Sequence, residues 1–375
     1  MPSLNPACWQ LAVDLARKWA DDGRVPAITI ATGTKDRVHG PVSFGVRTIA
    51  DSKPLPERPI YLIASITKPV VAMGFLKLVE RGLVTLGDRV TEYLPDFGKQ
   101  GKYGVEIRHL LTHTSGLPDM TPSNVELRKA NAPLSKFLEE ICTLPLAFPP
   151  GRGVQYQSTG FLVLSEILHR VTGQLCPAFL RQEVFQPLGM CDTALGAPDE
   201  WFSTNAELQH PNADRIPEVR LETEQLLGKS WNWNSRFWRQ LGAPWGGLLT
   251  TAEDLVQFAQ CLLRNGRSAD DQVLWSPATV SAATTNQLVA MKEIPEDERR
   301  CRPWGLGWRL NWLAHSANFG DLLGPHTFGH WGATGTLMWI DPERGTFAII
   351  LTTQPQEPTG FFLARLSNAI AAAWS

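Results

Sequence analysis

The chain has 375 residues, of which 43% are hydrophobic and 19% are charged, the composition of an ordinary globular protein. Its 35 basic and 37 acidic residues give a net charge of −2, and no run of Lys or Arg is longer than two residues. This balance argues against a surface for nucleic acid or for an anionic membrane. The length exceeds that of a typical single domain, so two lobes are expected.

The N-terminal segment predicts a helix rather than a targeting signal. Residues 8–22 place Trp9, Val13, Ala16 and Ala20 on one helical face. The first residues lack a basic region followed by an apolar stretch, and no apolar run reaches the roughly 18 residues that span a bilayer. We therefore expect a soluble, cytoplasmic protein. The scattered cysteines form no C-x-x-C pair, so reduced thiols are expected rather than disulfides or metal ligands.

Strand and helix patterns follow along the chain. β-Rich runs predict strands at 27–33 and 42–47, joined by a turn-rich link. A helix is expected from Ser65 to Arg81, because Gly82 can cap its C-terminus. The stretch from 83 to about 261 is predicted to be helical segments separated by Pro/Gly loops. The clearest of these helices span 134–144, 160–172 and 252–264.

Strand character returns in the last quarter of the chain. The predicted strands there are 306–312, 328–331, 336–340 and 346–352, and a last helix is predicted at 361–374. Strands at both ends with helices between them indicate an α+β fold, with an antiparallel sheet built from both termini, flanked by helices and interrupted by an all-helical lobe. We expect a discontinuous sheet domain of residues 1–64 plus 270–375 and a mainly helical domain of residues 65–269. The active site would lie in the cleft between them.

The first chemical motif is Ser65-Ile-Thr-Lys68. Residues three apart at the start of a helix share a face, so the lysine amine can hydrogen-bond the serine hydroxyl. A serine beside a base is a candidate nucleophile, provided that burial disfavours the charged form of the lysine. The alternative is a helix-capping serine followed by a solvated lysine.

The second motif is Tyr156-Gln-Ser158, which follows a rigid Pro/Gly loop. A tyrosine beside a Ser/Lys pair can take a proton from the nucleophile and pass it to the leaving group. The alternative is a structural tyrosine that is half-buried and has a satisfied hydroxyl.

The third motif is His330-Trp331-Gly332 on a predicted strand. A glycine there lets a substrate backbone approach closely, and the backbone N–H that follows it could pair with that of Ser65 as an oxyanion hole. The alternative is a strand glycine at a bulge beside an ordinary core histidine.

Taken in this order, the motifs resemble those of the serine β-lactamase and penicillin-binding-protein superfamily. The match is to its class C-like branch, which includes family VIII carboxylesterases, D-aminopeptidases and D-alanyl-D-alanine carboxypeptidases. The similarity covers about residues 25–355, with supporting stretches at Leu110–Leu117, Phe148–Gly151, Tyr156–Gly160 and Gly246–Leu255. The resemblance implies a β-lactamase-like fold in which Ser65 is acylated and Lys68 and Tyr156 act as base and acid. It also implies that the N–H groups of Ser65 and Ala333 form the oxyanion hole.

Two departures from the family pattern bear on the substrate. The second motif usually ends in asparagine, and Ser158 stands there instead. The third motif of lactamases and carboxypeptidases is Lys-Ser/Thr-Gly, whereas this chain has His330, Trp331 and Gly332. A lysine and a hydroxyl would hold a substrate carboxylate, while tryptophan offers bulk and histidine is mostly neutral at pH 7. These substrate-binding positions therefore favour esters or amides with an apolar part.

The sequence predicts a serine hydrolase that works through an acyl-enzyme on small esters or amides, without metal or organic cofactor. The alternatives are a β-lactamase, a D-alanyl-D-alanine carboxypeptidase or D-aminopeptidase, and a non-catalytic binding scaffold on the same fold. The expected partner is a small molecule, with no nucleic acid and no membrane, and the oligomeric state is left open. Trp231, Trp233, Trp238 and Trp245 form either a satellite core or an aromatic wall over the cleft.

Overall fold

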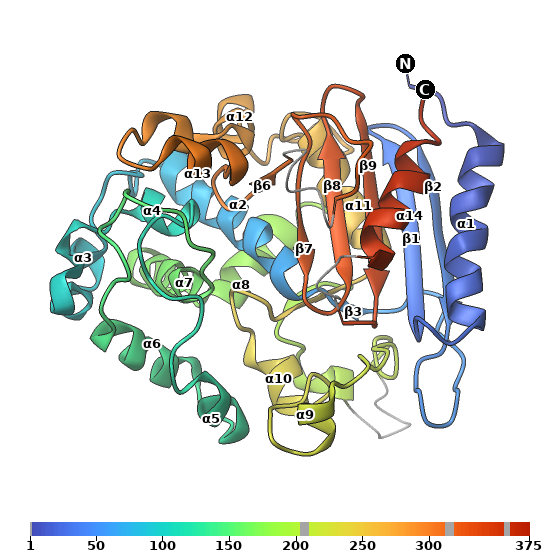
Figure 1. The fold of residues 1–375 in the computed structure, drawn as a ribbon, viewed down its shortest axis with the longest axis horizontal. Coiled ribbons are helices and arrows are strands. Elements are labelled where there is room, and N and C mark those ends of the chain that lie inside the picture. The colour runs from blue at the N-terminus through green and yellow to red at the C-terminus, as the bar shows by residue number, and fades with distance from the viewer. Residues whose placement is uncertain (1, 203–209, 312–318, 356–360) are drawn as a thin grey trace.

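A six-stranded antiparallel sheet forms one side of the computed structural model, which describes residues 2–202, 210–311, 319–355 and 361–375 (Figure 1). In spatial order its strands are β2 (Val38–Gly45), β1 (Ala27–Thr34), β9 (Thr346–Thr352), β8 (Thr336–Asp341), β7 (Phe328–Gly332) and β6 (Arg309–Leu310). Strand β1 pairs with β9, so Ile28 lies opposite Thr352. The two chain ends therefore build one sheet, and the predicted α+β fold is confirmed.

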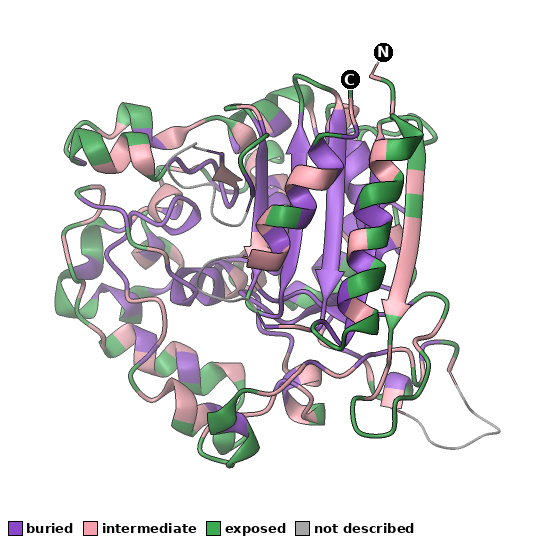
Figure 2. Ribbon diagram, turned by 45° about the vertical axis from the view of Figure 1, so that its right-hand side comes forward, coloured by how far each residue is buried: buried purple, intermediate pink, exposed green. Residues whose placement is uncertain are grey.

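Helices cover both faces of this sheet. Helices α1 (Pro6–Asp21) and α14 (Phe361–Ala371) pack together on one face, and α11 (Ala252–Leu263) lies on the other, against β1 and β9 (Figure 1). Strands β8 and β9 are buried along their whole length, which is why their sequences are almost continuously apolar (Figure 2). Strand β2 lies at the edge and is more exposed.

The other side of the molecule is mainly helical and is centred on α2 (Thr67–Glu80). This helix is buried around most of its circumference and packs against α7 and α8. The remaining helices are α3 (Val90–Tyr93), α4 (Ile107–Leu111), α5 (Asn124–Lys129), α6 (Leu134–Thr143), α7 (Thr159–Thr172), α8 (Cys176–Leu180), α9 (Thr223–Leu226), α10 (Arg236–Leu241), α12 (Pro277–Thr284) and α13 (Glu296–Cys301).

A small second sheet fixes the segment that precedes α2. Its strands are β3 (Tyr61–Leu62), β5 (Leu248–Thr250) and β4 (Ala194–Leu195), with β5 in the middle. This pairing brings the chain around residue 245 beside the start of α2. The exact division into domains at 64/65 and 269/270 stays a prediction.

Two predicted elements differ from the structure for local reasons. Strand β2 starts earlier than predicted because Gly40 and Pro41, which suggested a turn, lie within an edge strand, where proline is tolerated. The strand predicted at 306–312 shortens to β6, because Gly307 adopts a left-handed conformation with φ +78° and interrupts the extended chain. Residue 312 lies outside the described residues.

Within the described residues, every helix is too short or too polar to cross a bilayer.

Candidate active site

Ser65 and Lys68 meet where the sheet side of the molecule joins α2. Ser65 lies in a 3₁₀ turn, Ala64–Ile66, directly before the helix, and Lys68 occupies the first helical turn. The lysine Nζ donates to Ser65 Oγ at 3.1 Å and to the Trp245 carbonyl oxygen at 2.9 Å. The carbonyl holds the amine in place, so the Ser/Lys contact predicted from the spacing is present in the folded protein.

The backbone directly before Ser65 is held in an uncommon conformation. Ala64 has φ +46°, a left-handed value that costs energy for a residue with a side chain. The end of β7 packs tightly against this turn. A Cβ added at Gly332 would lie only 2.2 Å from the Ile63 carbonyl oxygen, so only glycine fits there. The Thr334 and Thr336 hydroxyls donate to the carbonyls of Leu62 and Ile63. These contacts therefore hold the turn that carries Ser65 against the end of β7, where the third motif lies.

The surroundings of Lys68 disfavour the charged form of its amine. The side chain is 0% exposed, and this desolvation lowers its pKa to about 7 from an ordinary value of 10.5. Asp119 opposes the drop and Arg128 reinforces it. A large fraction of the amine is thus uncharged near neutral pH and can accept a proton from Ser65.

We expect a pH profile that reports this lysine. Because the base predicted from the sequence is the neutral amine, kcat/KM on a neutral ester should rise with pH and level off above an apparent pKa near 7. About a tenth of the amine is neutral one pH unit below that value and about nine tenths one unit above it. Initial rates across pH with a pH-stable ester check this. A rate that keeps climbing toward the ordinary lysine pKa would contradict the assignment.

Tyr156 lies beside the Ser65–Lys68 pair. Its ring centre lies 4.7 Å from Lys68 Nζ, and burial raises the pKa of its hydroxyl, an effect that hydrogen bonding with Ser65 partly opposes. The hydroxyl is therefore protonated at neutral pH, where it can serve as a proton donor. Its ring packs beside His113 and Trp304, with ring centres 4.8 Å and 6.0 Å away.

His330 and Trp331 lie differently along β7. His330 is 1% exposed, and burial with the nearby Lys68 holds its pKa well below the ordinary value, so the ring is neutral. Its ring centre lies 6.0 Å from that of Tyr156. Trp331 is half-buried and packs edge-to-face on Phe319, in the cluster beneath α1 and α14. Neighbouring residues of a strand face opposite sides of the sheet, which explains the separation.

Ser158 and Ala333 border the same region. Ser158 is buried at the start of α7, and its backbone N–H donates to the Asp119 carbonyl oxygen at 3.0 Å. Ala333 is exposed and follows Gly332 at the end of β7. Its N–H and that of Ser65 stay a predicted oxyanion hole.

A family model described as Beta-lactamase matches residues 12–373, almost the whole chain. The chain belongs to this family of serine hydrolases. A curated relative, "Putative D-alanyl-D-alanine carboxypeptidase" of Escherichia coli K12, is 29% identical over 345 residues, which is 84% of this chain and 75% of the relative.

Solved structures of the Beta-lactamase fold match over the full length of both chains. A family VIII carboxylesterase superposes with a TM-score of 0.77 at 20% identity, covering 100% of each chain. A penicillin-binding protein homologue from Caulobacter crescentus also gives 0.77, at 22% identity and 100% coverage of each chain. At such identities these matches establish the fold alone.

In this Beta-lactamase family member, the charged side chain of Arg309 lies near Tyr156 and His330, which the sequence motifs did not indicate. The guanidinium carbon lies 4.1 Å from the ring centre of Trp331 and 5.3 Å from that of Trp304. Its charge acts on Tyr156, His113 and His330. Arg309 belongs to none of the three motifs, and the pairing of β6 with β7, in which it lies opposite Gly329, brings it beside the third motif.

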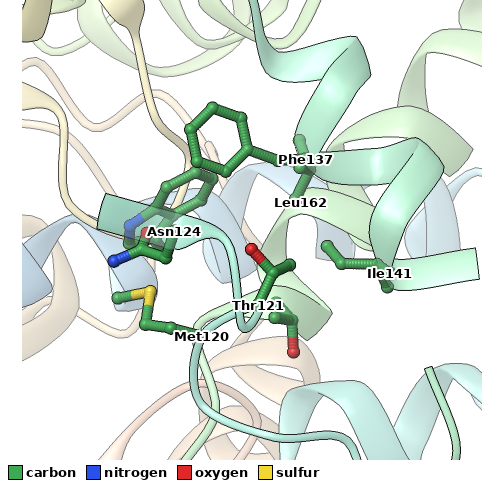
Figure 3. Close-up of a pocket in the computed structure, with 8 residues that line it drawn as sticks. Met120, Thr121, Asn124, Phe137, Ile141 and Leu162 are labelled. Carbon is green, nitrogen blue, oxygen red and sulfur yellow. The ribbon is translucent and has the colours of Figure 1, made fainter. Parts of the chain in front are cut away.

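Trp233, Trp238 and Trp245 are buried in the main core and Trp231 packs against it, so the cluster is not a separate satellite core. Trp231 lies 4.2 Å from Trp233 and 4.5 Å from Trp238 between ring centres, and Trp238 lies 6.4 Å from Trp245. Beside Trp245 is a cavity of about 10 Å³, which has room for about one water molecule but not for an acyl chain (Figure 3). Its lining comprises Met120, Thr121, Asn124, Phe137, Ile141, Thr159, Leu162 and Trp245.

Proposed function

We propose that the protein hydrolyses small esters or amides through an acyl-enzyme on Ser65. The observation that carries this proposal is the 3.1 Å contact from Lys68 Nζ to Ser65 Oγ, made by a fully buried lysine. Family membership and the protonated Tyr156 beside the pair support the same chemistry.

In the proposed reaction, Lys68 Nζ takes the hydroxyl proton as Ser65 Oγ bonds to the substrate carbonyl carbon. The carbonyl π electrons move to the oxygen, and the N–H groups of Ser65 and Ala333 stabilise that oxyanion. When the oxyanion collapses, the bond to the leaving group breaks, and Tyr156 supplies the proton that the alkoxide or amine takes away. Tyr156 regains a proton from Lys68. Water then repeats the sequence on the acyl-enzyme and releases the acid.

The third motif favours neutral substrates. His330 is buried and uncharged at a position where a lysine would offer a cation to a substrate carboxylate, and Trp331 supplies no hydroxyl. A charge-assisted hydrogen bond contributes about 1.5–3 kcal/mol, so its loss weakens the binding of a carboxylate about ten- to a hundred-fold. Small neutral esters and amides have no carboxylate, so the absence of this lysine and hydroxyl does not weaken their binding.

A D-alanyl-D-alanine carboxypeptidase is the second candidate, and Arg309 is the observation that favours it. Its guanidinium adds a positive charge beside Tyr156, which would attract a terminal carboxylate. The E. coli relative carries that activity in its name.

A substrate panel separates the two candidates. We expect the purified protein to hydrolyse a short p-nitrophenyl ester with a kcat/KM at least about ten-fold above its value for a chromogenic cephalosporin or a peptide ending in D-alanyl-D-alanine. The reverse order, with the carboxylate-bearing peptide preferred, would reject the esterase proposal in favour of the carboxypeptidase. Location in the cytoplasm also stays a proposal, tested by cell fractionation.

A further inference from the structure

A buried cation lies near the catalytic lysine without a part in the proposed reaction. Arg128, near the end of α5, is only 4% exposed. Its guanidinium carbon lies 4.2 Å from the ring centre of Trp231, 4.3 Å from that of Trp238 and 6.0 Å from that of Trp245. Its Nε has no hydrogen-bond partner, and among the described residues no carboxylate forms an ion pair with it. Aromatic faces, rather than an acid, hold this charge.

An unpaired carboxylate oxygen lies in the same region. The Asp119 carbonyl accepts the N–H groups of Ser158 and Thr159, which ties this residue to the start of α7. Its side-chain Oδ1 is buried and has no hydrogen-bond partner. Asp119 is half-buried as a whole, and its negative charge interacts favourably with the positive charge of the caged guanidinium.

Both charges act on Lys68. Asp119 favours the charged amine, and Arg128 disfavours it. Asp119 in turn raises the pKa of Arg128, which burial lowers to about 9, so the guanidinium stays charged at neutral pH. The other titratable groups that face Lys68 are Tyr156, which is protonated, and the neutral rings of His113 and His330. The charge at Lys68 is therefore governed by burial and by this opposed pair.

We propose that Arg128 is a positioning residue of the active site, whose caged charge counterbalances Asp119 so that the Lys68 amine is free to accept the Ser65 proton. Trp245, one of the three rings around Arg128, is also the residue whose carbonyl oxygen accepts a hydrogen bond from Lys68 Nζ. This inference rests on the proposed function. It gives the tryptophan cluster a role in catalysis through the charge that it holds, without contact with substrate.

The test is the pH dependence of Ser65 modification by a fluorophosphonate probe, which needs no knowledge of the natural substrate. Second-order rate constants would be measured from acidic to alkaline pH for wild type, Arg128→Met, Arg128→Lys, Asp119→Asn and the double variant Arg128→Met/Asp119→Asn. Intact-mass spectrometry reports the adduct, and circular dichroism reports the fold.

Opposite shifts are expected from the two charges. Arg128→Met should move the acid limb of the profile up by about half to one pH unit, because Asp119 is left unbalanced beside Lys68. Asp119→Asn should move it down by a similar amount, and the double variant should return close to wild type. Arg128→Lys keeps the charge and should restore most of the wild-type limb. If Arg128→Met does not fold, the inference is still tested by two results. These are the downward shift of the acid limb in Asp119→Asn and the near-wild-type position of the acid limb in Arg128→Lys.

Lys129→Met is the matched control, because it removes a positive charge from the next residue of α5 in an exposed position, where solvent screens it. Its limb should coincide with that of wild type. Folded Arg128 and Asp119 variants whose rates fall while the limb stays fixed would overturn this inference and leave the cage a structural role. A wild-type protein that forms no adduct on Ser65 would overturn the proposed function itself.

Discussion

Changing Ser65→Ala is expected to abolish turnover, lowering kcat by about 10⁴-fold or more, because the covalent route is lost with the nucleophilic oxygen. The fold should persist, since the substitution removes one hydroxyl from a turn that hydrogen bonds of Thr334 and Thr336 hold in place. Ester hydrolysis and the mass of the protein after treatment with a fluorophosphonate probe check both points. The wild type should gain one adduct on Ser65, and the variant none.

Ser281→Ala is the matched control, because this exposed serine on α12 lies outside the site. It should keep wild-type turnover and adduct formation. Near-normal activity in Ser65→Ala would show that the nucleophile is misassigned. A wild-type protein with neither turnover nor adduct would favour the non-catalytic scaffold.

Changing Tyr156→Phe is expected to lower kcat by about 10²–10⁴-fold, because in the proposed reaction the phenol supplies the leaving-group proton. The ring remains, so the packing on His113 and Trp304 and the contact with Lys68 should survive. The acid limb that reports Lys68 should stay near its wild-type position. Steady-state rates on esters with good and poor leaving groups provide the measurement, and the poor leaving group should suffer more.

Tyr103→Phe makes the same chemical change at a tyrosine that is 64% exposed and remote from the motifs. Its kinetics should match those of wild type. A loss of only a few-fold in Tyr156→Phe, equal for both leaving groups, would reduce Tyr156 to a positioning role.

Much of the fold follows from local patterns in the sequence. The predicted helices at 134–144, 160–172 and 252–264 and the predicted strands at 336–340 and 346–352 agree with α6, α7, α11, β8 and β9 to within about two residues. In long runs that are strongly periodic or β-rich, the secondary structure that the residues prefer locally is also the one that buries their apolar side chains. Prediction was poorer at β2, where strand pairing outweighed the turn signal of Gly40 and Pro41, and at β6, where the left-handed backbone of Gly307 shortened the strand.

The sequence by itself determined the pairing of Ser65 with Lys68 at the start of a helix, because their spacing brings the two side chains together within one helical turn. It did not determine the pKa of Lys68, and therefore not the protonation state of its amine. Only the tertiary structure buries Lys68 completely, places the Trp245 carbonyl on its amine and surrounds it with Tyr156. Arg128 and Arg309 likewise reach the site through contacts distant in sequence. A pKa depends on desolvation and on charges within several ångströms, and these are properties of packed neighbours rather than of sequence spacing.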